Sequence, residues 1–434
     1  MKVAFETLGC KVNHYESEAL KSMFEKRGYA LADFHEYADV YVINTCTVTN
    51  QSDAKSRKMI RKAVKRNPEA VVAVIGCYAQ LESGTIEAID GVDIIMGTVN
   101  RPRLLEYVEK VLRERKPIKD ITKTQGLKAF DSLKLDHFEK NTRAFLKIQD
   151  GCNQFCSYCI IPFARGPIRS KPLHEVLDET KHLVRKGYKE IVLSGIHTGG
   201  YGTDLQDTSF YDLLAALSDI EGLRRLRISS VEINQLTDPI LDLIESKDVF
   251  ARQLHIPLQH GDDAVLAHMR RRYTVAEYLE KIEAIRRRMP SIAITTDLIV
   301  GYPTEDEVAF ESMLETVKKA AFSELHVFPY SRRGGTKAAK MKHQVHGAIK
   351  SRRVNDLITL GESLALEYRK ALEAKGKRLD VLFETCDEGI CEGHSSEYVR
   401  IQVQSDKHLE NTLQPVVIEK ADYPVSKGHL VHKK

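Results

Sequence analysis

The residues best suited to do chemistry in this 434-residue chain are three cysteines in one short segment. Cys152, Cys156 and Cys159 have the spacing C-x3-C-x2-C, in the run CNQFCSYC. Three thiolates in one loop can each bind an iron of a [4Fe–4S] cluster, which leaves the fourth iron open. A structural zinc site needs four ligands, and no nearby His or Cys completes such a set at standard zinc spacing. The motif therefore predicts a reactive iron–sulfur cluster.

Three further cysteines stand apart from one another in the N-terminal part of the chain. They are Cys10 after ETLG, Cys46 after VINT and Cys77 after AVIG, so each follows a β-rich run. Because the carboxyl ends of parallel strands meet at one edge of a sheet, cysteines at three such ends can converge. Three buried small hydrophobic residues are the alternative, since free cysteine is often buried. Their equivalent positions favour a second three-ligand cluster.

The remaining composition is that of an ordinary globular protein, with 42% hydrophobic and 29% charged residues. Eight cysteines are far too few for a disulfide scaffold. We expect no role for Cys386 and Cys391, although their loop, with His394, could bind adventitious metal. The chain has no long apolar run and no secretory pattern at its start, which predicts a cytoplasmic protein with no membrane span. A formal net charge of +4 does not by itself indicate a nucleic-acid binder.

The elements that must position the first two sets of cysteines form an α/β pattern. Over residues 1–111, short apolar runs alternate with helical stretches, which is typical of a parallel sheet covered on both faces. We predict a doubly wound, flavodoxin-like domain there, followed by a charged linker over 112–142. The expected strands are 3–9, 39–45, 70–76 and 92–97, and the expected helices are 16–27 and 52–66.

Residues 143–370 contain six strand candidates that alternate with helical patterns. This predicts a six-unit partial (βα) barrel with its site at the carboxyl ends of the strands. Residues 371–434 show period-two alternation and no helical period, which predicts a small all-β barrel or sandwich. The expected barrel strands are 144–149, 190–195, 225–230, 252–257, 293–301 and 324–330, and the helices are 172–186, 210–217, 239–246, 275–288, 305–320 and 348–372.

A C-x3-C-x2-C motif directly after the first strand of a six-unit partial barrel resembles the radical S-adenosylmethionine (SAM) superfamily. The resemblance implies that SAM binds the open iron and is cleaved to a 5′-deoxyadenosyl radical, while the protein binds and orients it. It also implies that Tyr158 lies near the adenine of SAM. Further cofactor contacts are expected at the later strand ends, where ordinary turn or packing roles are the alternative. These residues are Gly195, His197, Ser229, Glu232, His255, Gln259 and Asp297.

Nearly the whole chain is similar to the methylthiotransferases, which join a domain with three separated cysteines, a radical SAM core and a C-terminal β domain of the TRAM type. The motifs include LGCKVNHYESE (8–18), INTCTVTNQSDAKSR (43–57), DGCNQFCSYCIIPFARGPIRS (150–170) and HVFPYSRRGGTKAAKM (326–341). KVNHYESE and NTCTVTN resemble the branch that acts on N6-threonylcarbamoyladenosine in tRNA. The resemblance implies two [4Fe–4S] clusters, one of them an auxiliary cluster on the three separated cysteines.

The activity that this resemblance implies is insertion of a methylthio group at C2 of N6-threonylcarbamoyladenosine, at adenosine-37 next to the anticodon. SAM would be both methyl donor and radical source, and a sulfur donor and an electron donor of the flavodoxin or ferredoxin type are implied as partners. An aromatic C–H carries no acidic proton, so acid–base residues could not activate it at neutral pH. The target base must also leave its stack, as a base in an anticodon loop can.

Other functions remain open from the residues alone. The substrate could be isopentenyladenosine in tRNA or a ribosomal protein side chain, or the reaction could be a different radical SAM reaction. A cobalamin-dependent enzyme would be expected to carry D-x-H-x-x-G, and the nearest match, Asp33-Phe-His35-Glu-Tyr-Ala38, lacks the glycine. An electron carrier would not need a six-unit barrel.

The expected contacts to RNA do not lie in the C-terminal segment, which holds more acidic than basic residues. Basic clusters near predicted strand ends and loops are better candidates for phosphate contacts with the anticodon loop. They are Arg270, Arg271, Arg272, Arg332 and Arg333.

Overall fold

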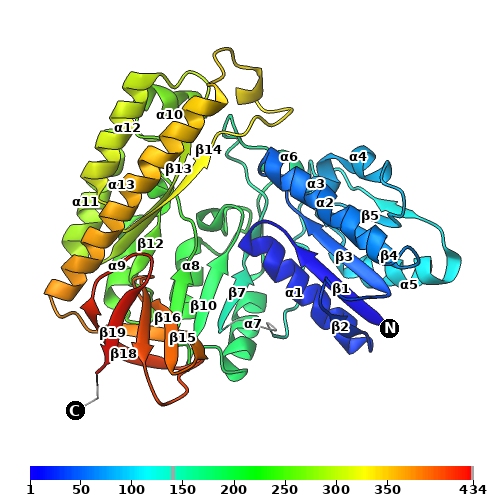
Figure 1. Ribbon diagram of the computed structural model, residues 1–434, viewed down its shortest axis with the longest axis horizontal. Helices are drawn as coiled ribbons and strands as arrows, with labels where there is room; N and C mark the ends of the chain where they lie inside the picture. The colour runs from blue at the N-terminus through cyan, green and yellow to red at the C-terminus, as the bar shows by residue number, and fades with distance from the viewer. Residues whose placement is uncertain (138–141, 432–434) are drawn as a thin grey trace.

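The computed structural model describes residues 1–137 and 142–431, so 138–141 of the expected linker and 432–434 of the expected C-terminal domain lie outside it. An N-terminal α/β unit and a larger partial barrel stand side by side, and a small β barrel closes the base of the larger unit (Figure 1). Within the described part of the chain, no helix has the length and apolarity needed to cross a membrane.

The N-terminal unit is built on a six-stranded parallel sheet in the order β2-β1-β3-β4-β5-β6. Its central strands are entirely buried, as expected of valine- and isoleucine-rich strands covered on both faces. Its strands are β1 (Lys2–Thr7), β2 (Ala30–Ala32), β3 (Val40–Thr45), β4 (Val71–Gly76), β5 (Ile94–Met96) and β6 (Ile118–Asp120). Its helices are α1 (Lys11–Lys26), α2 (Asn50–Arg66), α3 (Cys77–Leu81), α4 (Ser83–Glu87), η1 (Arg101–Arg103) and α5 (Leu104–Glu114).

The two faces of this sheet have separate cores. Leu20 of α1 and Val108 of α5 pack with Val42 on one face, and Ile60 of α2 packs with Ile43 on the other. The doubly wound fold expected for this segment is therefore confirmed.

The segment expected to be a linker is more ordered than predicted. Its residues Ile118–Asp120 form β6, in which Ile118 pairs with Ile94 at the edge of the sheet. Leu133 and Leu135 are buried in the core between α1 and the larger unit. A strand of three residues is too short to show a period of two, which explains why the charged composition dominated the prediction.

The larger unit is the six-strand partial barrel that the sequence predicts. Its strands form two parallel sheets, β7-β10-β11 and β12-β13-β14, and an isolated bridge between Ser230 and His255 joins them. The strands are β7 (Arg143–Lys147), β10 (Glu190–Ser194), β11 (Arg225–Ile228), β12 (Gln253–His255), β13 (Ala293–Val300) and β14 (Glu324–Pro329), with a short pair β8 (Gln149–Asp150) and β9 (Arg169–Ser170) after β7.

Helices cover the outer face of these strands, as Figure 1 shows for α11, α12 and α13. All six expected helices match the observed ones within two residues at each end, while a seven-residue helix, α10, was not predicted. The helices are α6 (Ile161–Arg165), α7 (Leu173–Arg185), η2 (Thr198–Gly200), α8 (Phe210–Ser218), η3 (Ile233–Gln235), α9 (Asp238–Ser246), α10 (Asp263–Met269), α11 (Val275–Arg288), α12 (Glu307–Ala320), η4 (Ala338–Lys340) and α13 (Gly347–Ala374).

The C-terminal unit is a closed barrel with the strand order β15-β16-β17-β19-β18. It has its own core, which includes Val381, Phe383 and Ile401. Its strands are β15 (Leu379–Asp387), β16 (Ile390–Ser395), β17 (Arg400–Gln404), β18 (Leu413–Lys420) and β19 (Ser426–Leu430). The small β barrel is therefore confirmed, with two strands, β16 and β19, that the sequence pattern did not reveal.

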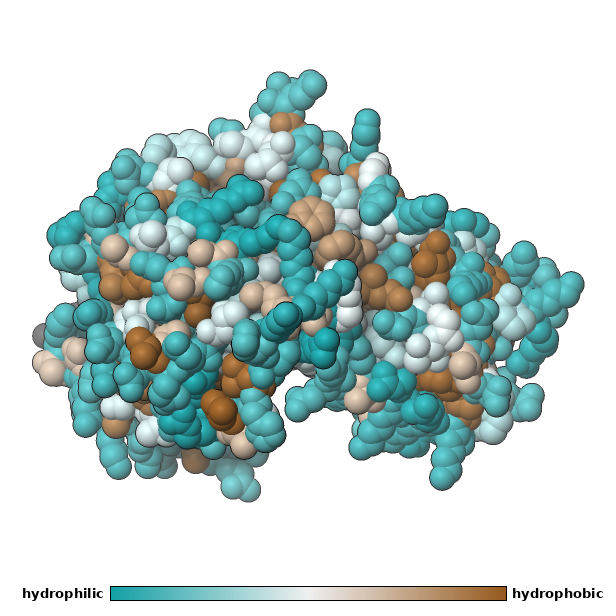
Figure 2. Space-filling view, turned by 90° about the horizontal axis from the view of Figure 1, so that it is seen from above, coloured by the Kyte–Doolittle hydropathy of each residue, from teal (hydrophilic) through white to brown (hydrophobic). Residues whose placement is uncertain are grey.

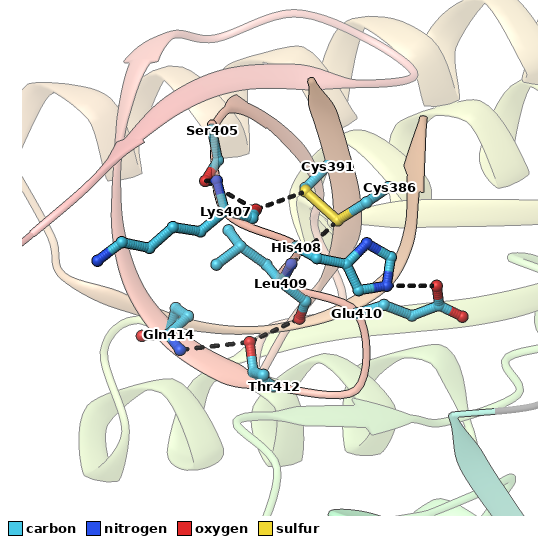
Figure 3. Close-up of a disulfide and its surroundings, with 9 residues drawn as sticks. All are labelled: Cys386, Cys391, Ser405, Lys407, His408, Leu409, Glu410, Thr412 and Gln414. Atoms are coloured by element: carbon cyan, nitrogen blue, oxygen red, sulfur yellow. Dashed lines mark hydrogen bonds and ion pairs between the residues drawn. A yellow bond between two sulfur atoms is a disulfide. The ribbon is translucent and has the colours of Figure 1, made fainter. Parts of the chain in front are cut away.

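The two C-terminal cysteines do not form a metal-binding loop. Cys386 of β15 and Cys391 of β16 are directly opposite each other across a tight turn, and their sulfurs form a disulfide (Figure 3). His394 faces Glu384 instead, with 3.1 Å between Nδ1 and Oε1. Because both sulfurs are bonded to each other, the expectation that this loop could bind adventitious metal is wrong.

Candidate active site

The three cysteines of the C-x3-C-x2-C motif, Cys152, Cys156 and Cys159, lie in the loop that follows β8 at the carboxyl end of the barrel; we call them the loop triad. Gly151 starts this loop with a φ of 72°. A Cβ at Gly151 would overlap the carbonyl oxygen of Pro167, so only glycine fits here. The Cys159 N–H donates to the carbonyl of Cys156 at 3.0 Å, which closes the loop on itself.

The loop triad has the chemistry of a cluster-binding donor set. Burial, with a smaller effect of the neighbouring thiols, raises the pKa of Cys152 to about 11 and that of Cys159 to about 12. A thiol must lose its proton to bind iron, and positive charge from the metal offsets the cost of burying the thiolates. The guanidinium of Arg271, 3.6 Å from the Cys156 sulfur, adds positive charge at this site. The three sulfurs therefore fit a [4Fe–4S] cluster.

The other three free cysteines, Cys10, Cys46 and Cys77, lie at the carboxyl ends of β1, β3 and β4, which are neighbours in the sheet; we call them the sheet-end triad. Gly9, with a φ of 104°, lets the chain pass so close that a Cβ there would lie 2.9 Å from the Cys46 sulfur. Cys10 is exposed, whereas Cys46 and Cys77 are buried. The structure therefore brings together cysteines that are separated by about 30 residues in sequence.

The sheet-end triad resembles the loop triad in its electrostatics. Burial, with a smaller effect of Cys10 and Cys46, raises the pKa of Cys77 to about 11. Burial likewise raises the pKa of Cys46. Arg165 acts against these effects, since its Nε donates to the Cys77 sulfur at 3.2 Å. Three thiols beside one buried cation again form a donor set that fits an iron–sulfur cluster.

Arg165 is a site residue that sequence reasoning missed. It belongs to α6, just after the loop triad, and it is fully buried. Its guanidinium pairs with Glu16 of α1 and Asp150 of β8, each at 3.0 Å. Arg165 thus joins the chain segment of one triad to a sulfur of the other. It stands inside the motif DGCNQFCSYCIIPFARGPIRS, but its role depends on contacts with residues about 90 and 150 positions away.

One cavity of about 410 Å³ lies between the two triads. Cys10 and Cys159 both line it, so each triad contributes a sulfur-bearing residue to its wall. Exposed apolar side chains, including Val48 and Phe328, make most of its surface nonpolar. Figure 2 shows apolar side chains gathered along the junction of the two units at this end of the molecule. The other lining residues are Thr49, Tyr158, Ile160, Ile161, Gln259, Asp297, Ile299, Pro329, Tyr330 and Ser331.

The residues expected to contact the cofactor fall into two groups. His197 and Glu232 reach the loop of the loop triad through Gln154 and Arg271. Gly195 and Ser229 belong to the same group, because both lie beside Thr198 at the ends of the neighbouring strands β10 and β11. Glu232 pairs with Arg271 at 2.9 Å, and His197 lies beside Gln154 and Gln235 with Nε2 distances of 3.5 and 2.7 Å. The other group, with Tyr158, His255, Gln259 and Asp297, lies at or beside the cavity wall.

Asp297 is the centre of a cluster that the sequence did not predict as such. Its carboxylate lies 3.2 Å from His255 Nε2 and 3.2 Å from His326 Nδ1. The two imidazoles stack with their centroids 5.4 Å apart. Hydrogen bonding to Asp297 raises the pKa of His326, although burial acts in the opposite direction. His326 was not a predicted site residue, because only the pairing of β13 with β14 places it opposite Asp297.

Two of the five arginines expected to contact RNA are engaged inside the protein, which corrects that prediction. Arg271 is buried between Glu232 and Cys156. Arg333 is buried against the N-terminal unit, 2.7 Å from the carboxylate of Asp53. Ion-paired, buried guanidiniums cannot reach a phosphate without leaving their partners uncompensated. Arg270, Arg272 and Arg332 are exposed.

A six-strand partial barrel that carries C-x3-C-x2-C at its carboxyl end defines a radical SAM core, here facing a second unit with three more cysteines. Residues 146–317 match the radical SAM superfamily, and residues 2–97 match a family described as uncharacterized protein family UPF0004. TsrM of Kitasatospora setae, a radical SAM methyltransferase solved with cobalamin and a [4Fe-4S] cluster, has a similar fold with a TM-score of 0.57. The alignment covers 78% of this chain and 76% of TsrM at 14% identity, so it shows the fold alone.

Sequence relatives define the family more closely. Threonylcarbamoyladenosine tRNA methylthiotransferase MtaB of Bacillus subtilis is 44% identical over 99% of this chain and 96% of its own length. A tRNA-2-methylthio-N(6)-dimethylallyladenosine synthase of Thermoanaerobacter pseudethanolicus is 38% identical over 87% of this chain and 81% of its own length. The chain belongs to the radical SAM tRNA methylthiotransferases. Enzymes of the radical SAM class use a [4Fe–4S] cluster and SAM.

Proposed function

We propose that the protein inserts a methylthio group at C2 of N6-threonylcarbamoyladenosine, at adenosine-37 next to the anticodon of tRNA. SAM serves in this proposal as methyl donor and as radical source. The observation that carries it is a cavity whose wall includes Cys10 of one triad and Cys159 of the other. A base in this cavity lies within reach of two sulfur-ligated centres, and the relative from Bacillus subtilis is named for this substrate.

Each triad has a distinct role in the proposal. The loop triad holds the [4Fe–4S] cluster which, with SAM bound, supplies the 5′-deoxyadenosyl radical. The sheet-end triad holds a second [4Fe–4S] cluster at the side of the cavity where Cys10 is exposed. The apolar walls at Val48, Ile299 and Phe328 accept the flat base and keep water from the radical.

The proposal also includes the partners of the enzyme. Arg270, Arg272 and Arg332 are exposed and are the proposed phosphate contacts for the anticodon loop. A flavodoxin- or ferredoxin-type protein is the proposed electron donor, and a separate sulfur donor restores the sulfur that each turnover consumes.

The number of clusters is tested by an iron count after anaerobic reconstitution. Two [4Fe–4S] clusters correspond to about 8 iron per chain and one cluster to about 4. Cys46→Ala should lower the count by about 4 and abolish the methylthio product, while 5′-deoxyadenosine still forms with a strong chemical reductant. A variant that also stopped forming 5′-deoxyadenosine would contradict this division of roles.

The substrate is tested by nucleoside analysis. Reconstituted protein is incubated with SAM, a sulfide source and two tRNA preparations, one with N6-threonylcarbamoyladenosine and one with dimethylallyladenosine at position 37. The proposal expects the methylthio product from the first tRNA alone. Product from the dimethylallyl tRNA alone, or from a protein side chain, would assign the enzyme to another branch of the family.

A further inference from the structure

We propose that Lys11 and His326 bind the free carboxylate of the threonyl group and so select the substrate of this enzyme. The inference rests on the proposed function, because N6-threonylcarbamoyladenosine carries one carboxylate whereas dimethylallyladenosine carries none. Lys11 follows Cys10 directly and begins α1, so it stands at the same strand end as the sheet-end triad.

The charged side chains that act on Lys11 belong to the barrel rather than to the N-terminal unit. The charges that act on its ammonium group include Arg143 of β7, Glu190 of β10, Arg227 of β11 and Asp297 of β13. Charged side chains of four barrel strands are therefore near enough to act on this residue of the N-terminal unit. Lys11 is nevertheless accessible to solvent. Because the preceding residue, Cys10, lines the cavity between the two units, Lys11 stands at the edge of that cavity.

The Lys11 ammonium lacks a counter-ion. Over residues 1–137 and 142–431, its nitrogen makes no hydrogen bond or ion pair. The nearby anions already have partners, since Glu190 pairs with Arg225 and Arg227 at 2.9 and 2.6 Å. Asp297 likewise lies 3.2 Å from each of two imidazoles. Neither anion is therefore a direct partner of Lys11, and an anion of the substrate would supply one.

His326 supplies a second hydrogen-bond donor. The charge of Lys11 acts on the His326 imidazole, so the two side chains lie near each other. Its Nδ1 faces Asp297, which orients the ring and leaves Nε2 as the second donor. Asp297 also lines the cavity between the triads, so Lys11 and His326 stand beside the place proposed for the base.

A carboxylate is the anion that this position fits best. The apolar walls of the cavity suit a base, and the threonyl carboxylate is the charged group that such a base carries with it. RNA phosphates remain on the backbone outside the cavity. An uncharged alkenyl substituent would leave Lys11 without a partner in a partly desolvated site, which disfavours the dimethylallyl substrate.

The test compares two anticodon stem-loop RNAs that differ in one group. One carries N6-threonylcarbamoyladenosine, and the other carries its primary amide, which has the same shape without the charge. Wild-type protein should show a kcat/KM about 100-fold higher for the acid than for the amide. In Lys11→Met this ratio should fall to about 1, and in His326→Gln it should fall part of the way. Lys58→Met, an exposed lysine on α2, should keep the wild-type ratio.

The outcomes separate the inference from the function on which it rests. If wild-type protein modifies neither RNA while 5′-deoxyadenosine still forms, the proposed function fails. If it modifies both with equal kcat/KM, or if Lys11→Met keeps the wild-type ratio, the function stands and the carboxylate site is wrong. Lys11→Arg, which keeps the charge, should restore most of the ratio. Iron content is measured for each variant, and a Lys11→Met protein that loses iron in step with its activity would make Lys11 a support of the sheet-end triad instead.

Discussion

A single buried arginine illustrates how much at the residue scale depends on tertiary contacts. Arg165 is fully buried and pairs with two buried carboxylates, those of Glu16 and Asp150, at 3.0 Å each. It also donates to the Cys77 sulfur. A buried charge of this kind is stable only while all its partners are in place. Arg165 therefore acts as a positioning residue that ties the loop triad to the sheet-end triad.

Replacement of Arg165 by methionine should lower the free energy of unfolding by about 3–5 kcal/mol, because two buried carboxylates lose a common partner. Urea denaturation of the full chain measures this change. Arg113→Met removes an exposed arginine of α5 and should change the stability by less than about 0.5 kcal/mol. Equal stability of the two variants would show that the ionic network is not important for folding.

At the scale of elements, neighbouring strands of the partial barrel hold the C-terminal barrel in place. Glu190 of β10 pairs with Arg225 and Arg227 of β11. The same guanidiniums donate to the backbone carbonyls of Asp380 at 2.6 Å and Ser395 at 3.2 Å. One buried carboxylate therefore orients two cations that attach another unit.

This arrangement predicts a loss of stability in acid. Burial alone would raise the pKa of Glu190, but Arg227 and Arg225 lower it from 4.5 to about 2. A carboxyl group with a lowered folded-state pKa stabilises the protein above pH 4.5 and loses that effect as the pH falls towards 2. The contribution is about 3 kcal/mol, since each pKa unit corresponds to about 1.4 kcal/mol. The stability of Glu190→Gln should therefore depend less on pH between 5 and 3 than that of wild-type protein, as chemical denaturation measures.

The matched control for this pH profile is Glu221→Gln, which changes an exposed carboxyl group. Its profile should follow that of the wild-type protein. A Glu190→Gln profile with the wild-type slope would mean that other carboxyl groups, such as the buried Glu16, govern the acid transition.

At the scale of the whole molecule, the cavity exists because two separate units face each other. Arg333, in the loop after β14, reaches across to Asp53 and Asn50 of α2, at 2.7 Å each. The backbone N–H of Asn50 donates to the hydroxyl of Ser331 at 3.0 Å. These contacts lie beside the cavity and fix how far apart the two triads stand.

Arg333→Met should loosen this junction without touching either triad. We expect the yield of methylthio product per 5′-deoxyadenosine to fall about 10- to 100-fold, because small displacements of reacting groups are costly. Both products are quantified in the same reaction. Arg333→Lys should recover part of the yield, and Arg352→Met, which breaks a surface pair with Glu307, should leave it near the wild-type value. An unchanged yield in Arg333→Met would show that the junction does not set the coupling.

The sequence was most informative where local spacing or periodicity carries the signal. The spacing of Cys152, Cys156 and Cys159 indicated a cluster, and six strand candidates that alternate with helical patterns indicated the partial barrel. Short or irregular elements were missed, such as β6, β16 and β19. Strands of three to six residues with polar or glycine positions do not show a clear period of two.

The sequence by itself determined the class of fold, the two sets of three cysteines and the branch of the family that the chain resembles, because these depend on residue type and local order. Only the tertiary structure decided which side chains meet. It buried Arg271 and Arg333 in ion pairs, set Arg165 between the triads and placed Lys11 near charged side chains of the barrel. Each of these depends on distances between residues far apart in sequence. It also joined Cys386 to Cys391, which are only five residues apart but meet because β15 and β16 pair. Burial makes every charged partner matter, since water no longer replaces a lost contact.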